Sequence, residues 1–202
     1  MVWWSRRRDA DGWRMMERMK QQLREQVLAD AETPAGVLRA LRGGASLESI
    51  HLDERGRWWH EGAMFANEKL SQLFSRSVFQ TESGVWFLQI GHQSYPVTVA
   101  CTGHFAERLL MREAQTTLEL TTGEQLETGL DGWMTDGGER VGVRLADGRD
   151  VRLLGAAHQL VVSLVEATEA GWELHLRQGV AALGSWPEVP RGIRLPVEAA
   201  QG

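Results

Sequence analysis

The sequence predicts an α+β fold of two related units, each with two strands, a helix and two strands, behind an N-terminal amphipathic helical extension. The spacing of apolar residues changes from helical to alternating at about residue 46. The same order of elements then occurs twice, about 90 residues apart. Short turns join consecutive strands, so the pairing should be mostly antiparallel. These observations divide the chain into an extension (1–44), a first unit (45–112), a second unit (113–186) and a C-terminal tail (187–202).

The composition is that of one large globular domain or two small ones. The chain has 202 residues, of which 43% are hydrophobic, too many for a disordered protein. Cys101 is the only cysteine, which excludes an intramolecular disulfide and a cysteine zinc cluster. No apolar run is long enough to span a bilayer, and the arginines at 6–8 are followed by acidic residues rather than by the apolar part of an export signal. We therefore expect a cytoplasmic protein.

Charge is divided unevenly along the chain. The net charge is −5, yet residues 1–42 carry nine Lys/Arg against six Asp/Glu. The acidic remainder argues against a nucleic-acid partner, because nucleic-acid binders present a basic face.

The extension contains a helix over residues 11–31. Trp13, Met16, Leu23 and Val27 share one stripe at spacings of three and four. Such a stripe packs on its own domain or on a second copy of the chain. A basic helix containing tryptophan can also lie on an anionic membrane surface.

Each unit is assembled from short alternating runs around one helix. The first helix begins after Asn67, a good N-cap residue. In the second unit, residues 131–139 form a surface loop. The expected strands are 47–52, 57–60, 85–90 and 95–100 in the first unit, and 140–145, 150–154, 172–176 and 179–183 in the second, with a helix over 156–168 and an additional hairpin of 117–120 with 125–129.

A stretch of the first unit resembles a known bacterial family, domain of unknown function 1285. The similar residues are Trp59-His60-Glu61-Gly62, then Leu70-Ser-Gln-Leu-Phe-Ser75, then Trp86-Phe-Leu88, and the similarity is clearest over 48–105. The resemblance implies two similar α+β units. It implies no chemistry, because the family has no established activity, although a role in signalling or regulation has been suggested for it.

The candidate ligand or metal residues are His51, Trp58, His60 and Glu61. If Asp53–Gly56 is a tight turn, His51 pairs with Trp58, and both share a face with His60. Two imidazoles and a carboxylate can bind a divalent metal or act as an acid–base pair. Alternatively, both histidines are half-exposed strand residues without a role.

Tryptophan is unusually frequent, with nine residues. Exposed tryptophans are common anchors at protein interfaces. The interface candidates are Trp3, Trp4, Trp13 and Trp133; alternatively, these rings cover an apolar edge of the same chain.

No phosphate loop, nucleophile elbow or His-Glu-x-x-His motif occurs, so we predict no cofactor, no assigned metal and no catalytic residue. The leading hypothesis is a non-catalytic cytoplasmic binding or regulatory module, with an unidentified protein partner or self-association. One alternative is a metal-dependent or acid–base enzyme that uses His51, His60 and Glu61. A second is a membrane-surface protein held by the N-terminal helix.

Overall fold

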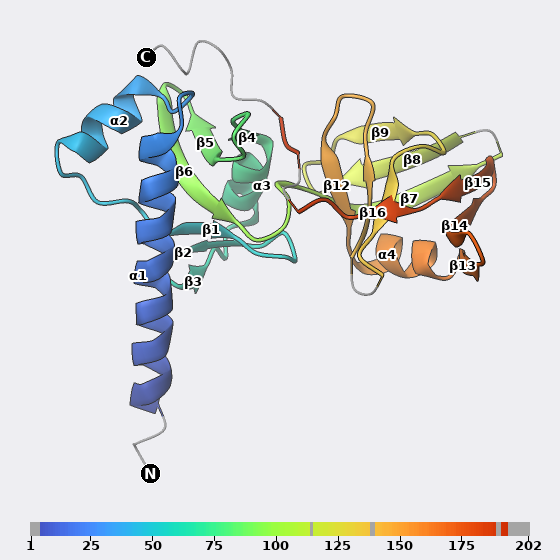
Figure 1. Ribbon diagram of the computed structural model, residues 1–202, viewed down its shortest axis with the longest axis horizontal. Helices are drawn as coiled ribbons and strands as arrows, with labels where there is room; N and C mark the ends of the chain where they lie inside the picture. Colours follow the sequence, from blue (N-terminus) through green and yellow to red (C-terminus); the bar gives the residue numbers. More distant parts are fainter. Residues whose placement is uncertain (1–4, 114, 138–139, 189–190, 194–202) are drawn as a thin grey trace.

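The two largest sheets lie side by side and give the molecule two lobes, which Figure 1 shows at the left and the right. The computed structural model describes residues 5–113, 115–137, 140–188 and 191–193. Helices and strands are mixed and most strand pairs are antiparallel, so the α+β class is confirmed.

The first lobe is a six-stranded sheet in the order β3-β2-β1-β6-β5-β4. Its one parallel pair is β1 with β6, where His51 lies opposite Thr98. The helix α3 begins where expected, because the Asn67 side chain accepts a hydrogen bond from the backbone N–H of Leu70. The elements are β1 (Ile50–Leu52), β2 (Trp58–His60), β3 (Ala63–Met64), α3 (Glu68–Arg76), β4 (Val78–Gln80), β5 (Trp86–Ile90) and β6 (Gln93–Val99).

The helices α1 (Ser5–Ala29) and α2 (Ala35–Arg42) cover one face of this sheet. Leu23 and Val27 of the predicted stripe are buried there against Leu41 and Phe87. The prediction that this stripe packs on its own domain is confirmed for these two residues. Figure 1 shows the N-terminal part of α1 extending beyond the sheet. Within the described residues, no helix has the length and apolar character needed to cross a membrane.

The second lobe contains a seven-stranded sheet in the order β16-β10-β11-β12-β7-β8-β9 and a separate three-stranded sheet, β13-β14-β15. One apolar core joins both sheets to α4. The elements are β7 (His104–Arg112), β8 (Gln115–Leu120), β9 (Gln125–Thr128), β10 (Trp133–Thr135), β11 (Val141–Arg144), β12 (Asp150–Leu153), α4 (Gly155–Val162), β13 (Val165–Thr168), β14 (Gly171–Leu176), β15 (Gly179–Ala182) and β16 (Gly184–Ser185).

The second half departs from the expected pattern in two places. The helix predicted over 156–168 ends at Val162, and Val165–Thr168 is a strand that pairs with β14. Valine and threonine favour a pleated surface, which apolar spacing alone does not show. The strand His104–Arg112, which the sequence division placed in the first unit, pairs with β8 and β12 in the second sheet. A structural repeat between the two halves stays a prediction.

Trp133 is buried rather than exposed in a loop. It begins β10, is 1% exposed, and donates from Nε1 to the backbone oxygen of Gly129 over 3.0 Å. The prediction that Trp133 lies in a surface loop and can anchor an interface was therefore wrong. A three-residue strand between glycines gives too short a pattern to reveal its inward face. Trp3 and Trp4 lie outside the described residues, and so does the Trp13 side chain.

The two lobes meet at Trp86 and at the segment Arg191–Ile193. An added Cβ at Gly103 would lie 2.5 Å from the Trp86 ring, and one at Gly192 would lie 2.3 Å from it. Both positions therefore require glycine for close packing. The backbone of this segment bonds to both lobes: Ile193 O accepts from the Gln80 N–H at 2.6 Å, and Arg191 O accepts from the Asp150 N–H at 2.8 Å.

The contrasting burial of two tryptophans gives a stability prediction. Trp133→Ala should lower the free energy of unfolding by about 3–5 kcal/mol, because it leaves a cavity in the core of the second lobe. Trp172→Ala, at a ring that is 46% exposed, should cost about 1 kcal/mol or less. Urea unfolding of both variants measures the difference. Equal losses would contradict the assignment of Trp133 to the core.

Candidate functional site

The β1–β2 hairpin has a register one residue away from the predicted one. Leu52 pairs with Trp58, so the connection runs from Asp53 to Arg57. Gly56 has φ +72°, the left-handed conformation that adds a bulged residue to such a turn. Because one added residue moves a strand's side chains to the opposite face, His51 lies on the face opposite Trp58 and His60. The prediction that all three side chains share one face was wrong for His51, whereas Trp58 and His60 do share a face.

His51 and Trp58 take separate places on the two faces of this hairpin. Trp58 is 1% exposed and donates from Nε1 to Ser75 Oγ at 3.0 Å, so it is a core residue. His51 is half-buried on the other face with Nδ1 2.9 Å from Thr98 Oγ1, and burial lowers its pKa. His51 and His60 also lie on opposite faces of the hairpin, so the structure does not bring them together as the predicted acid–base pair.

His60 and Glu61 are brought together as predicted, with Glu48 in place of His51 as their neighbour. His60 Nε2 lies 3.0 Å from Glu48 Oε2. Glu61 Oε1 accepts hydrogen bonds from Lys20 Nζ at 3.1 Å and from the Ser49 N–H at 3.2 Å. The hydrogen bond from Lys20 is the main reason that the pKa of Glu61 is lowered. The cluster lies at the surface of the first lobe.

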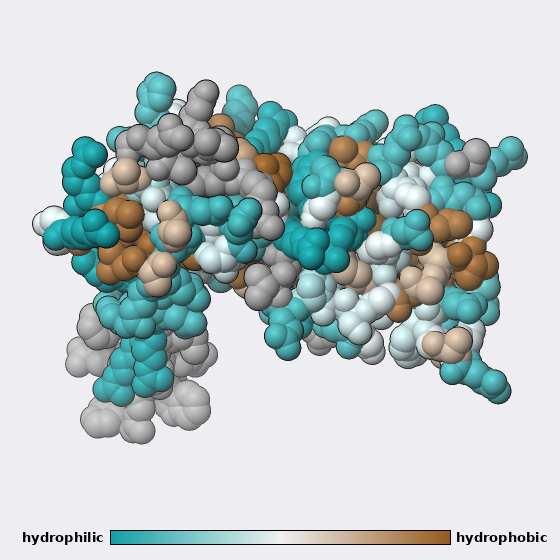
Figure 2. Space-filling view, turned by 45° about the horizontal axis from the view of Figure 1, so that its top comes forward, coloured by the Kyte–Doolittle hydropathy of each residue, from teal (hydrophilic) through white to brown (hydrophobic). Residues whose placement is uncertain are grey.

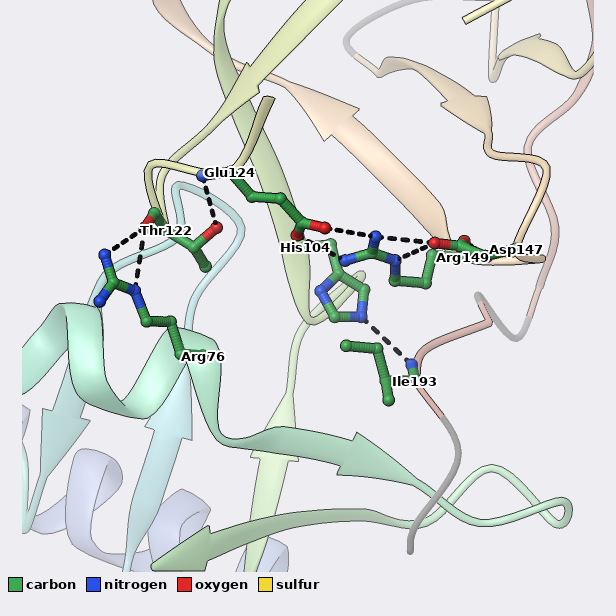
Figure 3. A network of polar contacts seen from close by, with 7 residues as sticks. All are labelled: Arg76, His104, Thr122, Glu124, Asp147, Arg149 and Ile193. Atoms are coloured by element: carbon green, nitrogen blue, oxygen red, sulfur yellow. Dashed lines mark hydrogen bonds and ion pairs between the residues drawn. The ribbon is translucent and has the colours of Figure 1, made fainter. Parts of the chain in front are cut away.

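A second polar cluster lies at the junction of the lobes and is centred on His104 (Figure 3). His104 begins β7, is 3% exposed, and accepts at Nε2 from the Ile193 N–H over 3.3 Å. Burial lowers its pKa to about 4, helped by the positive charge of Arg149. The ring is therefore neutral near pH 7, and its proton sits on Nδ1. Figure 3 shows Nδ1 turned toward Arg76 and Thr122, and no described residue accepts its hydrogen bond.

Arg149 forms the other side of this cluster. It is 6% exposed and its guanidinium contacts two carboxylates, with Nη1 2.9 Å from Glu124 Oε2 and Nη2 2.7 Å from Asp147 Oδ2. Burial alone would lower the pKa of Arg149 and raise that of Asp147. The ion pairs reverse both effects, so the pKa of Arg149 is raised and those of Asp147 and Glu124 are lowered. All three groups are charged at neutral pH.

Arg76 reaches the cluster from the last turn of α3. Its Nε and Nη2 donate to the backbone oxygen of Thr122 at 2.9 and 2.6 Å. No hydrogen bond or ion pair within the described part of the chain uses its Nη1. A positive charge from the first lobe thus lies against the β8–β9 turn without a carboxylate partner.

Two adjoining hollows lie beside this network. They share Glu124, Arg149 and Ile193. One has a volume of about 320 Å³ and is lined also by Ser75, Arg76, His104, Thr122 and Gly123. The other, of about 450 Å³, is lined also by Asp147, Gly148, Arg191 and Gly192. Together they offer donors from both lobes and from the tail to one small polar molecule.

An apolar groove of about 410 Å³ lies between α2 and β6, lined by residues such as Val37, Leu41, Tyr95 and Pro96. Figure 2 shows apolar side chains gathered over α2 and, at the other end of the molecule, near β14 and β15, where Val180 is exposed. The described lining of this groove includes one carboxylate, Glu48, and neither arginine nor lysine. The junction is the better candidate, because charged and hydrogen-bonding side chains from both lobes line its hollows.

The chain is similar to known proteins in its structure, but no sequence comparison gives a match. No family model matches the sequence, and neither does any curated protein. A DUF1285 family protein from Silicibacter pomeroyi DSS-3 matches with a TM-score of 0.55 and 14% identity, over 68% of this chain and 80% of that one. The chain shares the fold of a DUF1285 family protein.

A DUF1285 family protein from Shewanella baltica OS155 is less similar in structure, with a TM-score of 0.43 and 14% identity over 57% of this chain and 91% of that one. The distant DUF1285 resemblance read from Trp59–Gly62 is thus confirmed at the level of the fold.

The buried neutral His104 gives a pH prediction. The folded pKa of about 4 lies below the ordinary value of 6.5, so the unfolded chain binds this proton more readily. Stability should therefore fall as the pH drops from 6.5 to 4, with a total loss of about 3 kcal/mol from this group. The variant His104→Gln keeps an acceptor for the Ile193 N–H and should lose that part of the pH dependence. Urea unfolding between pH 7 and pH 4 compares the two proteins, and identical profiles would refute the assignment.

Proposed function

We propose that the protein is a non-catalytic binding module whose ligand site is the hollow between the lobes. The observation that carries this proposal is His104. It is a buried, neutral imidazole whose free N–H faces a hollow that is also lined by the guanidinium groups of Arg76 and Arg149. A ligand with hydrogen-bond acceptors that enters the hollow can bond to this N–H group and to the guanidinium groups beside it.

The ligand that fits these donors carries an anionic group. Arg76 contributes a charge without a carboxylate partner among the described residues, and His104 contributes a neutral donor to the same hollow. The charge of Arg149 is already neutralised by ion pairs with Glu124 and Asp147. We therefore expect Arg149 to hold these two carboxylates in place rather than to attract the ligand. Guanidinium groups bind phosphate and carboxylate oxygens in a planar, directional way. A small phosphate or polycarboxylate compound therefore suits the site.

The same geometry favours binding over catalysis. A base works best when its pKa lies near the working pH, and the pKa of His104 is about 4. The one hydroxyl on the α3 side, Ser75 Oγ, accepts a hydrogen bond from Trp58 and is not bonded to a histidine. These groups hold a ligand better than they activate one.

The position of Arg191–Ile193 supports a regulatory role for the module. Ile193 lines both hollows, and its N–H is the group that bonds His104. A ligand in the hollow would change how firmly Arg191–Ile193 is held, and a partner could respond to that change. We place this module in a reducing cytoplasm, where the buried thiol of Cys101 stays reduced.

Isothermal titration calorimetry with inorganic phosphate, pyrophosphate and citrate tests the site. At least one probe should bind at one per chain with a dissociation constant of about 1 mM or lower. Arg76→Gln should weaken that binding by about 10- to 100-fold, because it removes a charged hydrogen bond.

Arg108→Gln is the matched control, since Arg108 is an exposed arginine on β7 that pairs with Glu119. It should bind like the wild type. Failure of all three probes to bind, or equal binding by Arg76→Gln, would overturn the proposal.

A further inference from the structure

A separate cluster of potential metal ligands lies on the first lobe, where β1, β2 and α1 meet. Glu48, His60 and Glu61 each offer one ligand atom, and these atoms all lie within 4.8 Å of one another. Within the ranges that the structure describes, no other set of His, Cys, Asp and Glu side chains converges in this way. The cluster shares no residue with the hollows at the junction.

The imidazole of His60 is held in a fixed orientation. Its ring stacks on Phe65, with centroids 6.1 Å apart and planes 12° apart. Phe65 packs edge-on against Phe74, which packs edge-on against the buried Trp58. A chain of aromatic contacts thus connects this half-exposed histidine to the core. Nε2 is directed at Glu48 Oε2, 3.0 Å away.

Glu61 already holds a cation. Its Oε1 pairs with the ammonium group of Lys20 at 3.1 Å, and the Ser49 N–H fixes the same oxygen at 3.2 Å. The side chains of Lys20 and Glu61 are 23% and 47% exposed, so this ion pair is weak and exchangeable. A divalent ion that engages all three ligands would compete well with one ammonium group.

We propose that Glu48, His60 and Glu61 form a zinc site, with water completing the coordination. Ligand atoms in a tetrahedral zinc site lie about 3.4 Å apart, given metal–ligand distances of about 2.0–2.2 Å. The His60–Glu48 contact is already near that separation, and the ligand atom of Glu61, within 4.8 Å of the other two, would approach it on a change of side-chain rotamer. Two carboxylates balance the charge of the ion. An imidazole ligand selects zinc over magnesium and calcium, which prefer oxygen alone.

The test is equilibrium dialysis of the untagged full chain against zinc chloride, with metal counted by mass spectrometry. One zinc ion should bind per chain, and magnesium or calcium in excess should not displace it. Glu48→Gln and His60→Gln should each weaken zinc binding by at least about 10-fold, since even indirect partners of metal ligands contribute 10- to 100-fold. Both side chains are partly exposed, so both variants should fold, which circular dichroism verifies.

Lys20→Gln provides a test of opposite sign. It removes the competing ammonium group and should tighten zinc binding by about 2- to 5-fold. The matched control is Glu166→Gln, because Glu166 pairs with His175 at 3.5 Å on β13 and β14 without joining a converging group. It should leave zinc binding unchanged. Absence of bound zinc, equal binding by Glu48→Gln and His60→Gln, or weaker binding by Lys20→Gln would each overturn the proposal.

Discussion

The three-residue segment Arg191–Ile193 is the contact on which the arrangement of the lobes depends. Its backbone bonds to Gln80 in the first lobe and to Asp150 in the second, and Gly192 donates to the Gln80 side chain at 2.7 Å. Asp150 is fully buried and also receives Arg144 at 2.8 Å. The segment therefore satisfies buried polar groups that would otherwise destabilise both lobes. The hollow around His104 exists because this segment forms one of its walls.

Trp86 explains why the segment can approach so closely. Its ring lies between Gly103 and Gly192, and an added methyl group at either would overlap it. The ring also packs against His104, with ring centroids 6.2 Å apart, and so contributes to the burial of the imidazole. Burial of that imidazole lowers its pKa and leaves it a neutral hydrogen-bonding group. Packing at the junction thus determines the chemistry that the junction offers.

The sequence predicts the local elements well and their partners less well. Asn67 as an N-cap, the Asp147-Gly148 hairpin and the burial of Leu23 and Val27 in α1 follow from short-range rules, and all are present. The extra residue at Gly56 shifts the hairpin register by one position. This shift places His51 and His60 on opposite faces, so the prediction that they lie together was wrong. Within the candidate zinc site, His60 and Glu61 were predictable because they are adjacent. Glu48 was missed because only the true register places it beside His60.

The site at the junction could not be predicted from spacing. Its residues come from five separate segments of the chain: Arg76, His104, Glu124, Arg149 and Ile193. Arg76 ends a helix of the first lobe, whereas His104 begins a strand of the second. The glycines at 103 and 192 are a partial sequence signal for this junction, because both allow the backbone to pack closely against the Trp86 ring. The parallel pairing of β7 with β12 brings His104 near Arg149, and short-range sequence patterns do not predict that pairing.

Amide hydrogen exchange of the full chain tests the role of the tail most directly. The N–H groups of Gln80 and Asp150 donate to Ile193 and Arg191, so they should exchange only when the protein unfolds globally. In a chain that ends at Pro190, both amides should lose this protection, while the amide of Leu118 in β8 keeps it. Rapid exchange of Gln80 and Asp150 in the full chain, or equal protection in the shortened one, would contradict the conclusion that Arg191–Ile193 joins the two lobes.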